Sequence, residues 1–133
     1  MGIQISGTTN TISPTANGLK FTSVVASEYI NTLGNTGATP NIDLSLANFV
    51  TATLNENTTF TFSNAPSQAC SFTLVLTNDG TGSRTITWPA SVKWPNGTAP
   101  TRTSTANRTD VYTFFTYDSG TTWWGQLSLY NFS

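Results

Sequence analysis

The stretch DVYTFFTYDSGTTWWGQLSLYNFS, from Asp110 to Ser133, decides the fold. On both sides of the segment Asp118–Gly120, side-chain character alternates with a period of two residues. This pattern is typical of two strands joined by a turn. One face of this strand pair is apolar and the other is aromatic and polar. The first strand divides into Tyr112, Phe114 and Thr116 on one face and Val111, Thr113, Phe115 and Tyr117 on the other. The second divides into Trp123, Gly125, Leu127 and Leu129 on one face and Trp124, Gln126, Ser128, Tyr130 and Phe132 on the other.

The same alternation continues backwards along the chain to about residue 42, and no segment has apolar residues at helical spacing. Turn residues such as Asn, Asp, Gly and Pro separate the alternating segments. The predicted strands are Ile42–Leu46, Asn48–Leu54, Thr58–Ser63, Ser71–Asn78, Arg84–Trp88, Asp110–Tyr117 and Trp123–Tyr130. The sequence therefore predicts an all-β fold, an antiparallel β-sandwich or jelly-roll-like single domain.

The first forty residues differ from the rest, because their apolar pieces are short and lie among Thr, Asn and Gly. The segment Leu33–Asn41, LGNTGATPN, is interpreted as the boundary between these first residues and the rest of the chain. We therefore predict an extended N-terminal arm with first strands over residues 1–40 and a β-sandwich module over residues 41–133. The long segment Pro89–Asn107 contains Trp94 and is expected to pack against the domain.

Charge is scarce in this chain, since only 8% of the 133 residues are Asp, Glu, Lys or Arg, whereas about 25% is usual. Thr, Ser and Asn supply about two in five residues instead. Hydroxyls and amides can be buried in an interface at less cost than charges, so this composition suits lasting contact with other proteins. The alternative is a monomer of low solubility.

Four cations lie between Asp79 and Asp110 without a single acid, namely Arg84, Lys93, Arg102 and Arg108. This +4 segment could attract an acidic partner surface. Nucleic-acid binders usually carry a denser basic stripe and a high pI, whereas the pI here is about 4.9. We therefore expect no nucleic-acid partner.

The sequence offers little for catalysis. It contains no histidine, which excludes histidine-based nucleophile activation and histidine-ligated zinc. The six acids are scattered, although two could still converge as a glycosidase pair. Asp79 and Asp118 each lie in a segment typical of hairpin turns, without the alternating carboxylates of a calcium loop. We predict no enzyme activity, no cofactor and no metal.

Two other features favour structural interpretations. Cys70 begins the most apolar segment and is interpreted as a buried small hydrophobe rather than a nucleophile. The short Thr-x-Thr pieces at Thr51, Thr59, Thr85 and Thr101 have irregular spacing, which argues against an ice-binding solenoid. No apolar run approaches the roughly 20 residues that span a bilayer, and no signal peptide is evident, so no membrane contact is expected.

We expect another surface to pack against the aromatic and polar face of the last strand. A subunit contact or the other sheet is favoured, and a sugar-binding platform, which also combines Trp and Tyr with Asn and Gln, is the alternative.

From about Asn41 onward the chain resembles a β-rich module of tailed-bacteriophage virion proteins. The resemblance rests on NIDLSLANFVTATLNENTTFTFSN, SFTLVLTNDGTGSRTITWP, VKWPNGTAPT and DVYTFFTYDSGTTWWG. Where the family usually has Asp-Gly-Gly in the last turn, this chain has Asp118, Ser119 and Gly120. The resemblance implies a structural virion protein and no catalytic role.

Such modules occur at the ends of tail fibres and as small independent virion proteins. Because the chain is short and starts at Met1, we expect a capsid decoration (cement) protein that binds across the assembled shell and stabilises it. The expected partners are the major capsid protein and the chain itself, and the expected place is the outer surface of the virion, after synthesis in the host cytoplasm. The alternative is a tail-fibre or accessory tail protein that contacts host surface polysaccharide.

The resemblance also implies a homotrimer, with the exposed aromatic face as one contact. The N-terminal arm is expected to carry much of the attachment by adding a strand to an exposed edge. The predicted interface residues are Ile3, Ile5, Ile12, Trp124, Tyr130, Phe132, Arg84, Lys93, Arg102 and Arg108.

Overall fold

A computed structural model describes residues 27–133 and shows ten strands and one short 3-10 helix, η1 (Pro95–Gly97). The all-β class is confirmed. The predicted N-terminal contacts Ile3, Ile5 and Ile12 lie outside the described residues. Within residues 27–133, no helix is long and apolar enough to cross a membrane.

The main layer is a six-stranded sheet in the order β1-β3-β6-β9-β10-β8. Its first three strands, β1 (Ile30–Asn35), β3 (Phe49–Leu54) and β6 (Cys70–Asn78), are parallel neighbours. The strand β9 (Thr109–Thr116) pairs antiparallel with β6, and β10 (Trp123–Phe132) pairs antiparallel with β9. The last member, β8 (Val92–Lys93), is parallel to the start of β10.

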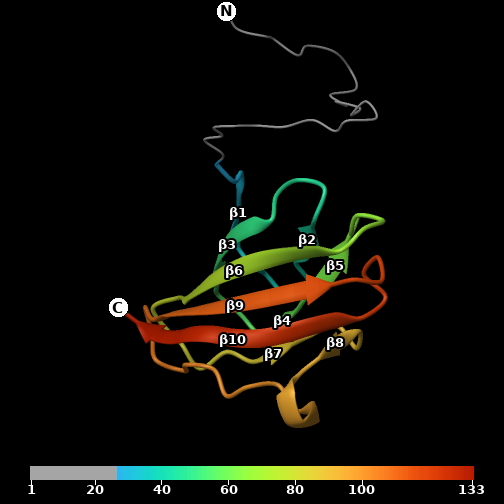
Figure 1. Ribbon diagram of the computed structural model, residues 1–133. Helices are drawn as coiled ribbons and strands as arrows, with labels where there is room; N and C mark the ends of the chain where they lie inside the picture. The colour runs from blue at the N-terminus through green and yellow to red at the C-terminus, as the bar shows by residue number, and fades with distance from the viewer. Residues whose placement is uncertain (1–26) are drawn as a thin grey trace, which may run out of the picture.

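A second layer lies behind this sheet in Figure 1. It contains β2 (Asn41–Asp43), β4 (Thr58–Thr59), β5 (Thr61–Ser63) and β7 (Ile86–Thr87). Only the inward-facing Phe60 separates β4 from β5, and the pairings of β2 with β5 and of β4 with β7 are both parallel. The layer is therefore three short parallel strands, of which the middle one is interrupted.

The chain passes alternately through the two layers, so residues 30–43, 49–63 and 70–87 form three successive coils of a two-layered β-solenoid. The antiparallel, jelly-roll-like arrangement predicted from the sequence is not what the first half adopts. The physical reason is the path of the turns, because Asn55–Asn57 and Asp79–Arg84 cross from one layer to the other. Two successive strands of the same sheet then run in the same direction.

The core lies between the two layers and is aromatic. Its fully buried side chains include Phe60 and Ile42 from the second layer and Leu74 and Tyr112 from the main sheet. The rings of Phe72 and Phe114 stack with centroids 4.8 Å apart, and Trp88 from the second layer lies 5.3 Å from Phe114. The alternation predicted for the strands corresponding to β3, β6 and β9 is confirmed, since every second residue there is buried.

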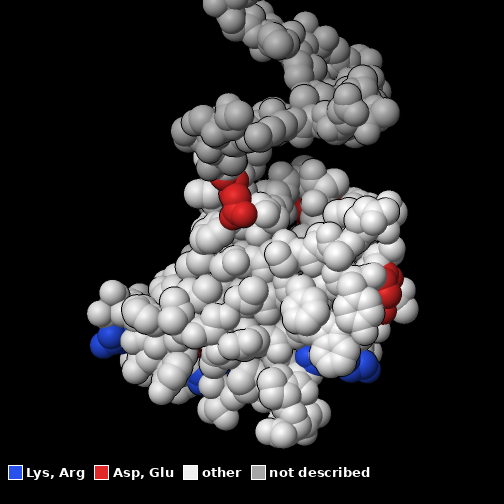
Figure 2. Space-filling model, viewed as in Figure 1, with Lys and Arg blue, Asp and Glu red and all other residues white. Residues whose placement is uncertain are grey.

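The outer face of the main sheet turns away from the core and is almost free of charge. Figure 2 shows this face with Lys, Arg, Asp and Glu only towards its borders. The strands of the sheet contain only two charged residues, Asp110 and Lys93, and Asp110 is buried. Large apolar side chains are exposed there instead, namely Ile30, Phe115, Trp124, Leu129 and Phe132.

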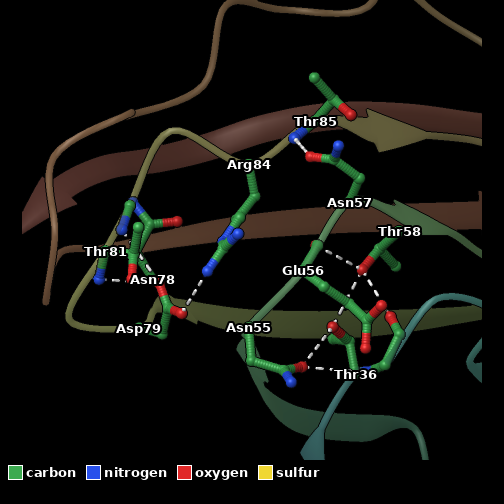
Figure 3. A network of polar contacts seen from close by, with 12 residues as sticks. Thr36, Asn55, Glu56, Asn57, Thr58, Asn78, Asp79, Thr81, Arg84 and Thr85 are labelled. Atoms are coloured by element: carbon green, nitrogen blue, oxygen red, sulfur yellow. Dashed lines mark hydrogen bonds and ion pairs between the residues drawn. The ribbon is translucent and has the colours of Figure 1, made fainter.

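A network of polar side chains stacks the turns of the three coils at one end of the solenoid (Figure 3). The Asn55 side chain in the second turn accepts a hydrogen bond from the Gly37 amide in the first turn (3.0 Å). The Asn57 side chain accepts one from the Thr85 amide in the third (3.0 Å). The Thr58 hydroxyl, which is buried, lies 3.0 Å from the Thr36 hydroxyl and donates to the Gly37 or Glu56 carbonyl. Hydrogen bonds of Asn and Thr side chains thus hold the turns of neighbouring coils together, where hydrophobic contacts cannot.

Candidate functional site

The two adjacent tryptophans of β10 have opposite environments. Trp123 is 2% exposed and its ring meets Phe62 and Phe72 edge-on, at centroid distances of 5.6 and 5.3 Å. Trp124 points outward, is 41% exposed and stacks on Phe115 of β9, with centroids 6.4 Å apart and planes 17° apart. Trp123 therefore closes the core, while Trp124 and Phe115 form an exposed aromatic pair.

The exposed pair borders a groove of about 280 Å³ between β10 and the segment that follows β8. We call it the aromatic groove. Three aromatic rings, a cation and an amide line it, and the full lining is Lys93, Trp94, Pro95, Thr113, Phe115, Trp124, Gly125 and Gln126. The shape is that of a shallow surface site with a large apolar area and a few polar groups, the usual features of a binding site for an amphipathic ligand.

Gly125 makes the groove possible because it lets Trp94 approach β10. A Cβ atom at this position would lie 2.8 Å from the Trp94 ring and 3.0 Å from the Phe114 ring. The half-buried Trp94 ring is held at the edge of the core, 5.5 Å from Trp88 and 5.7 Å from Phe114. The prediction that the segment Pro89–Asn107 packs against the domain is confirmed at this residue.

Lys93 lies next to Trp124, since these residues are partners in the parallel pairing of β8 with β10. Lys93, Trp124 and Phe115 form one row across three strands of the outer face. The Lys93 side chain is exposed, and within residues 27–133 it forms neither an ion pair nor a hydrogen bond. An unpaired ammonium group therefore stands beside two exposed rings.

The other cations of the predicted basic segment have different surroundings. Arg84 forms an ion pair with Asp79 at 3.0 Å, and this bond holds the pKa of the Asp79 carboxyl below its usual range. Arg102 donates to the Arg84 carbonyl (2.5 Å) and to the Asn78 side chain. Both are half-buried and support turns and loops. Arg108 is half-buried and, in the described part of the chain, has no side-chain hydrogen bond.

Two predicted contact residues lie away from the groove. Tyr130 and Phe132 are 67% and 51% exposed near the end of β10 and do not line it. A register shift between Leu127 and Leu129 turns Leu129 outward, to 51% exposure, so the predicted inward position of Leu129 is wrong. The far end of the outer face is thus a second exposed apolar region, which we call the β10 end.

The acids of the turns serve local structure. Asp118 lies in the turn that joins β9 to β10, as predicted, and bonds to the Thr122 amide (2.8 Å) and the Thr116 hydroxyl lower the pKa of its carboxyl. Asp79 lies in a turn between the two layers, so the hairpin predicted there is not formed. Within residues 27–133, no group of three or more His, Cys, Asp or Glu side chains is arranged to hold a metal ion.

Cys70 is half-buried at the start of β6 rather than fully buried, and burial raises the pKa of its thiol. A raised pKa disfavours the thiolate, which is the nucleophilic form.

Sequence reasoning identified Trp124 and Lys93 separately but did not bring them together. It also missed Phe115, Gln126 and the role of Trp94 in the groove. The available signal was the small residue Gly125 directly after Trp-Trp in β10, which marks a close approach by another group.

A comparison with protein families places residues 38–123 in a family described as "Putative phage tail fibre C-terminal domain". The matched segment begins before β2 and ends at Trp123, so it includes the second and third coils, β8 and β9. No curated protein and no solved structure matches the chain.

Proposed function

The chain belongs to the family of phage tail fibre C-terminal domains, and from this membership we propose that it contacts host surface polysaccharide through the aromatic groove. The family makes it a structural module of the phage virion. The sequence favoured a capsid decoration protein over a tail protein, but the family is named for the tail fibre. This supports the tail reading better than the capsid reading.

The observation that carries the proposal is the exposed row of Trp124 and Phe115 beside the amide of Gln126. Sugars present apolar C–H faces and polar hydroxyl edges, which match a flat ring next to a hydrogen-bonding side chain. Burial of two rings at 41% and 49% exposure would give such a ligand most of its contact area. The packing of residues 27–133 does not explain why these two rings are exposed.

Binding measurements with host envelope polysaccharides and with phage shells test the proposal. The full chain is mixed with purified bacterial envelope polysaccharides and, separately, with phage shells that lack it. We expect saturable binding to a polysaccharide and at least a tenfold loss of affinity in Trp124→Ala, since hot-spot aromatics commonly carry more than about 2 kcal/mol. Binding to shells with no affinity for polysaccharide would restore the capsid decoration reading.

We also propose that the chain self-associates as a trimer through the β10 end, where Leu129, Tyr130 and Phe132 are exposed. This contact leaves the aromatic groove open. Light scattering on the free protein should give three times the chain mass, and Phe132→Asp should reduce it. A monomer or a stable dimer at high concentration would contradict the trimer.

A further inference from the structure

The outer face of the main sheet has one exposed charge, and its position is the observation from which the inference starts. The outward residues of β1, β3, β6, β9 and β10 are all uncharged, and Lys93 of β8 is the exception. Thr and Ser hydroxyls occupy about half of these positions, as in the pairs Thr77–Thr109 and Thr113–Ser128. A neutral face therefore carries a single cation, and that cation lines the aromatic groove.

Packing does not explain Lys93. In the described part of the chain its ammonium group has no carboxylate within ion-pair distance, whereas Arg84 and Arg102 are bonded to their neighbours. The carboxylate of the β9–β10 turn, Asp118, is already hydrogen-bonded to Thr116 and Thr122. A carboxylate or phosphate that pairs with Lys93 would therefore come from outside the described residues.

We propose that the aromatic groove binds an anionic saccharide, with the acidic group of one sugar unit at the Lys93 ammonium and the ring of that or the next unit on Trp124 and Phe115. This inference rests on the proposed function and specifies its ligand class. The anion is a carboxylate of a uronic acid or a phosphate side group of a sugar unit, because a lysine ammonium is a point charge that pairs with either.

The geometry restricts how the ligand lies. Lys93, Trp124 and Phe115 are neighbours in one row, and adjacent strands are about 4.8 Å apart. From Lys93 to Phe115 the row thus spans about 10 Å. The chain of sugars would run across the strands, with Gln126 and Thr113 along one side.

Paired polysaccharides test the inference. Each acidic bacterial polysaccharide is compared with its neutralised form, carboxyl-reduced for uronic acids and dephosphorylated for sugars that carry phosphate as a side group, so that the sugar backbone is retained. Affinities are measured from the change in tryptophan fluorescence, since Trp124 is exposed. We expect the acidic form to bind about ten- to a hundredfold more tightly, as for a hydrogen bond to a charged group.

Variants separate the groove charge from the net charge of the protein. Lys93→Gln should weaken the binding of the acidic form by the same factor, so that the variant binds the acidic and the neutralised form with equal affinity. Lys93→Arg keeps the charge and should retain the preference. The control Thr59→Glu lowers the net charge by the same unit on an exposed residue of the second layer, and it should bind like the wild type.

The outcomes distinguish the inference from the proposed function. Equal affinity for both forms, with Trp124→Ala weakening both, would overturn the inference and leave polysaccharide binding standing. A charge preference that Thr59→Glu reduces as much as Lys93→Gln would also overturn it, because the attraction would then be non-specific. No binding to any polysaccharide would overturn both. The pair that shows the preference, carboxylate or phosphate, identifies the anion.

Discussion

The stacked-turn end of the solenoid and the aromatic groove differ in how their polar groups are satisfied. At the turns, the side chains of Asn55 and Asn57 bond to the neighbouring coils, and the Asp79 side chain bonds to the Thr81 amide of its own turn. At the groove, Lys93 has no partner among the described residues and two aromatic rings are exposed. The first arrangement stabilises the fold, whereas the second leaves an ammonium group and two aromatic rings available to a ligand. Four tests examine this contrast, the largest expected effect first.

The sharpest test compares the adjacent residues Trp123 and Trp124. Trp123→Ala removes a buried ring that contacts Phe62 and Phe72 and should lower the free energy of unfolding by about 3–5 kcal/mol. Trp124→Ala, which removes an exposed ring, should cost less than about 1.5 kcal/mol, the upper range for an aromatic pair. Urea denaturation measures both. Similar losses would mean that the groove is part of the core.

The stacked turns are tested by Thr58→Val, which keeps the shape of the side chain but removes its hydroxyl. The Thr36 hydroxyl and the Gly37 carbonyl then lose a buried partner, so the free energy of unfolding should fall by about 1–3 kcal/mol. Polysaccharide binding should be unchanged. The control Thr51→Val removes a hydroxyl from the outer face and should stay within about 0.5 kcal/mol of the wild type. If Thr58→Val were equally mild, the network would not contribute to stability.

The close approach at Gly125 is tested by Gly125→Ala. The added Cβ would lie 2.8 Å from Trp94, so this ring or β10 must shift, and overpacking of this kind costs about 1–3 kcal/mol. Unlike Thr58→Val, the change should also weaken polysaccharide binding because it deforms the groove. Wild-type affinity in a destabilised Gly125→Ala protein would show that Trp94 does not shape the site.

The smallest expected effect is on the stability of the fold at acidic pH. The hydrogen bond from Arg84 holds the pKa of Asp79 below the value of about 3.9 found in unfolded chains. Its stabilising contribution is therefore complete above about pH 4 and is lost as the pH falls through the lower folded pKa. Asp79→Asn should consequently show a smaller fall in Tm between pH 7 and pH 2 than the wild type.

Asp118→Asn is the matched change in the β9–β10 turn, where the Thr122 amide is the main cause of the lowered pKa. A reduced acid response is expected there too, without any effect on the stacked turns. An unchanged acid response in both variants would refute the assignment of these carboxylates to the pH dependence.

Much of the fold followed from the sequence because alternation with a period of two is a local property. It predicted β3, β6, β9 and β10 with small errors at their ends, and it put Phe114 and Phe115 on opposite faces. The strand predicted at Ile42–Leu46 is shorter, Asn41–Asp43, and the one at Arg84–Trp88 is reduced to Ile86–Thr87. The absence of histidine and the low charge were likewise fixed by composition.

Only the tertiary structure decided strand direction and the site. A turn such as Asn55–Asn57 has the same residue types whether it joins two strands of one sheet or crosses between layers, so the parallel coils could not be read from it. The groove depends on Lys93 meeting Trp124 and on Trp94 meeting Gly125, contacts that span about thirty residues of sequence. Such contacts arise from the packing of β8 against β10, and packing is a property of the whole domain rather than of any segment.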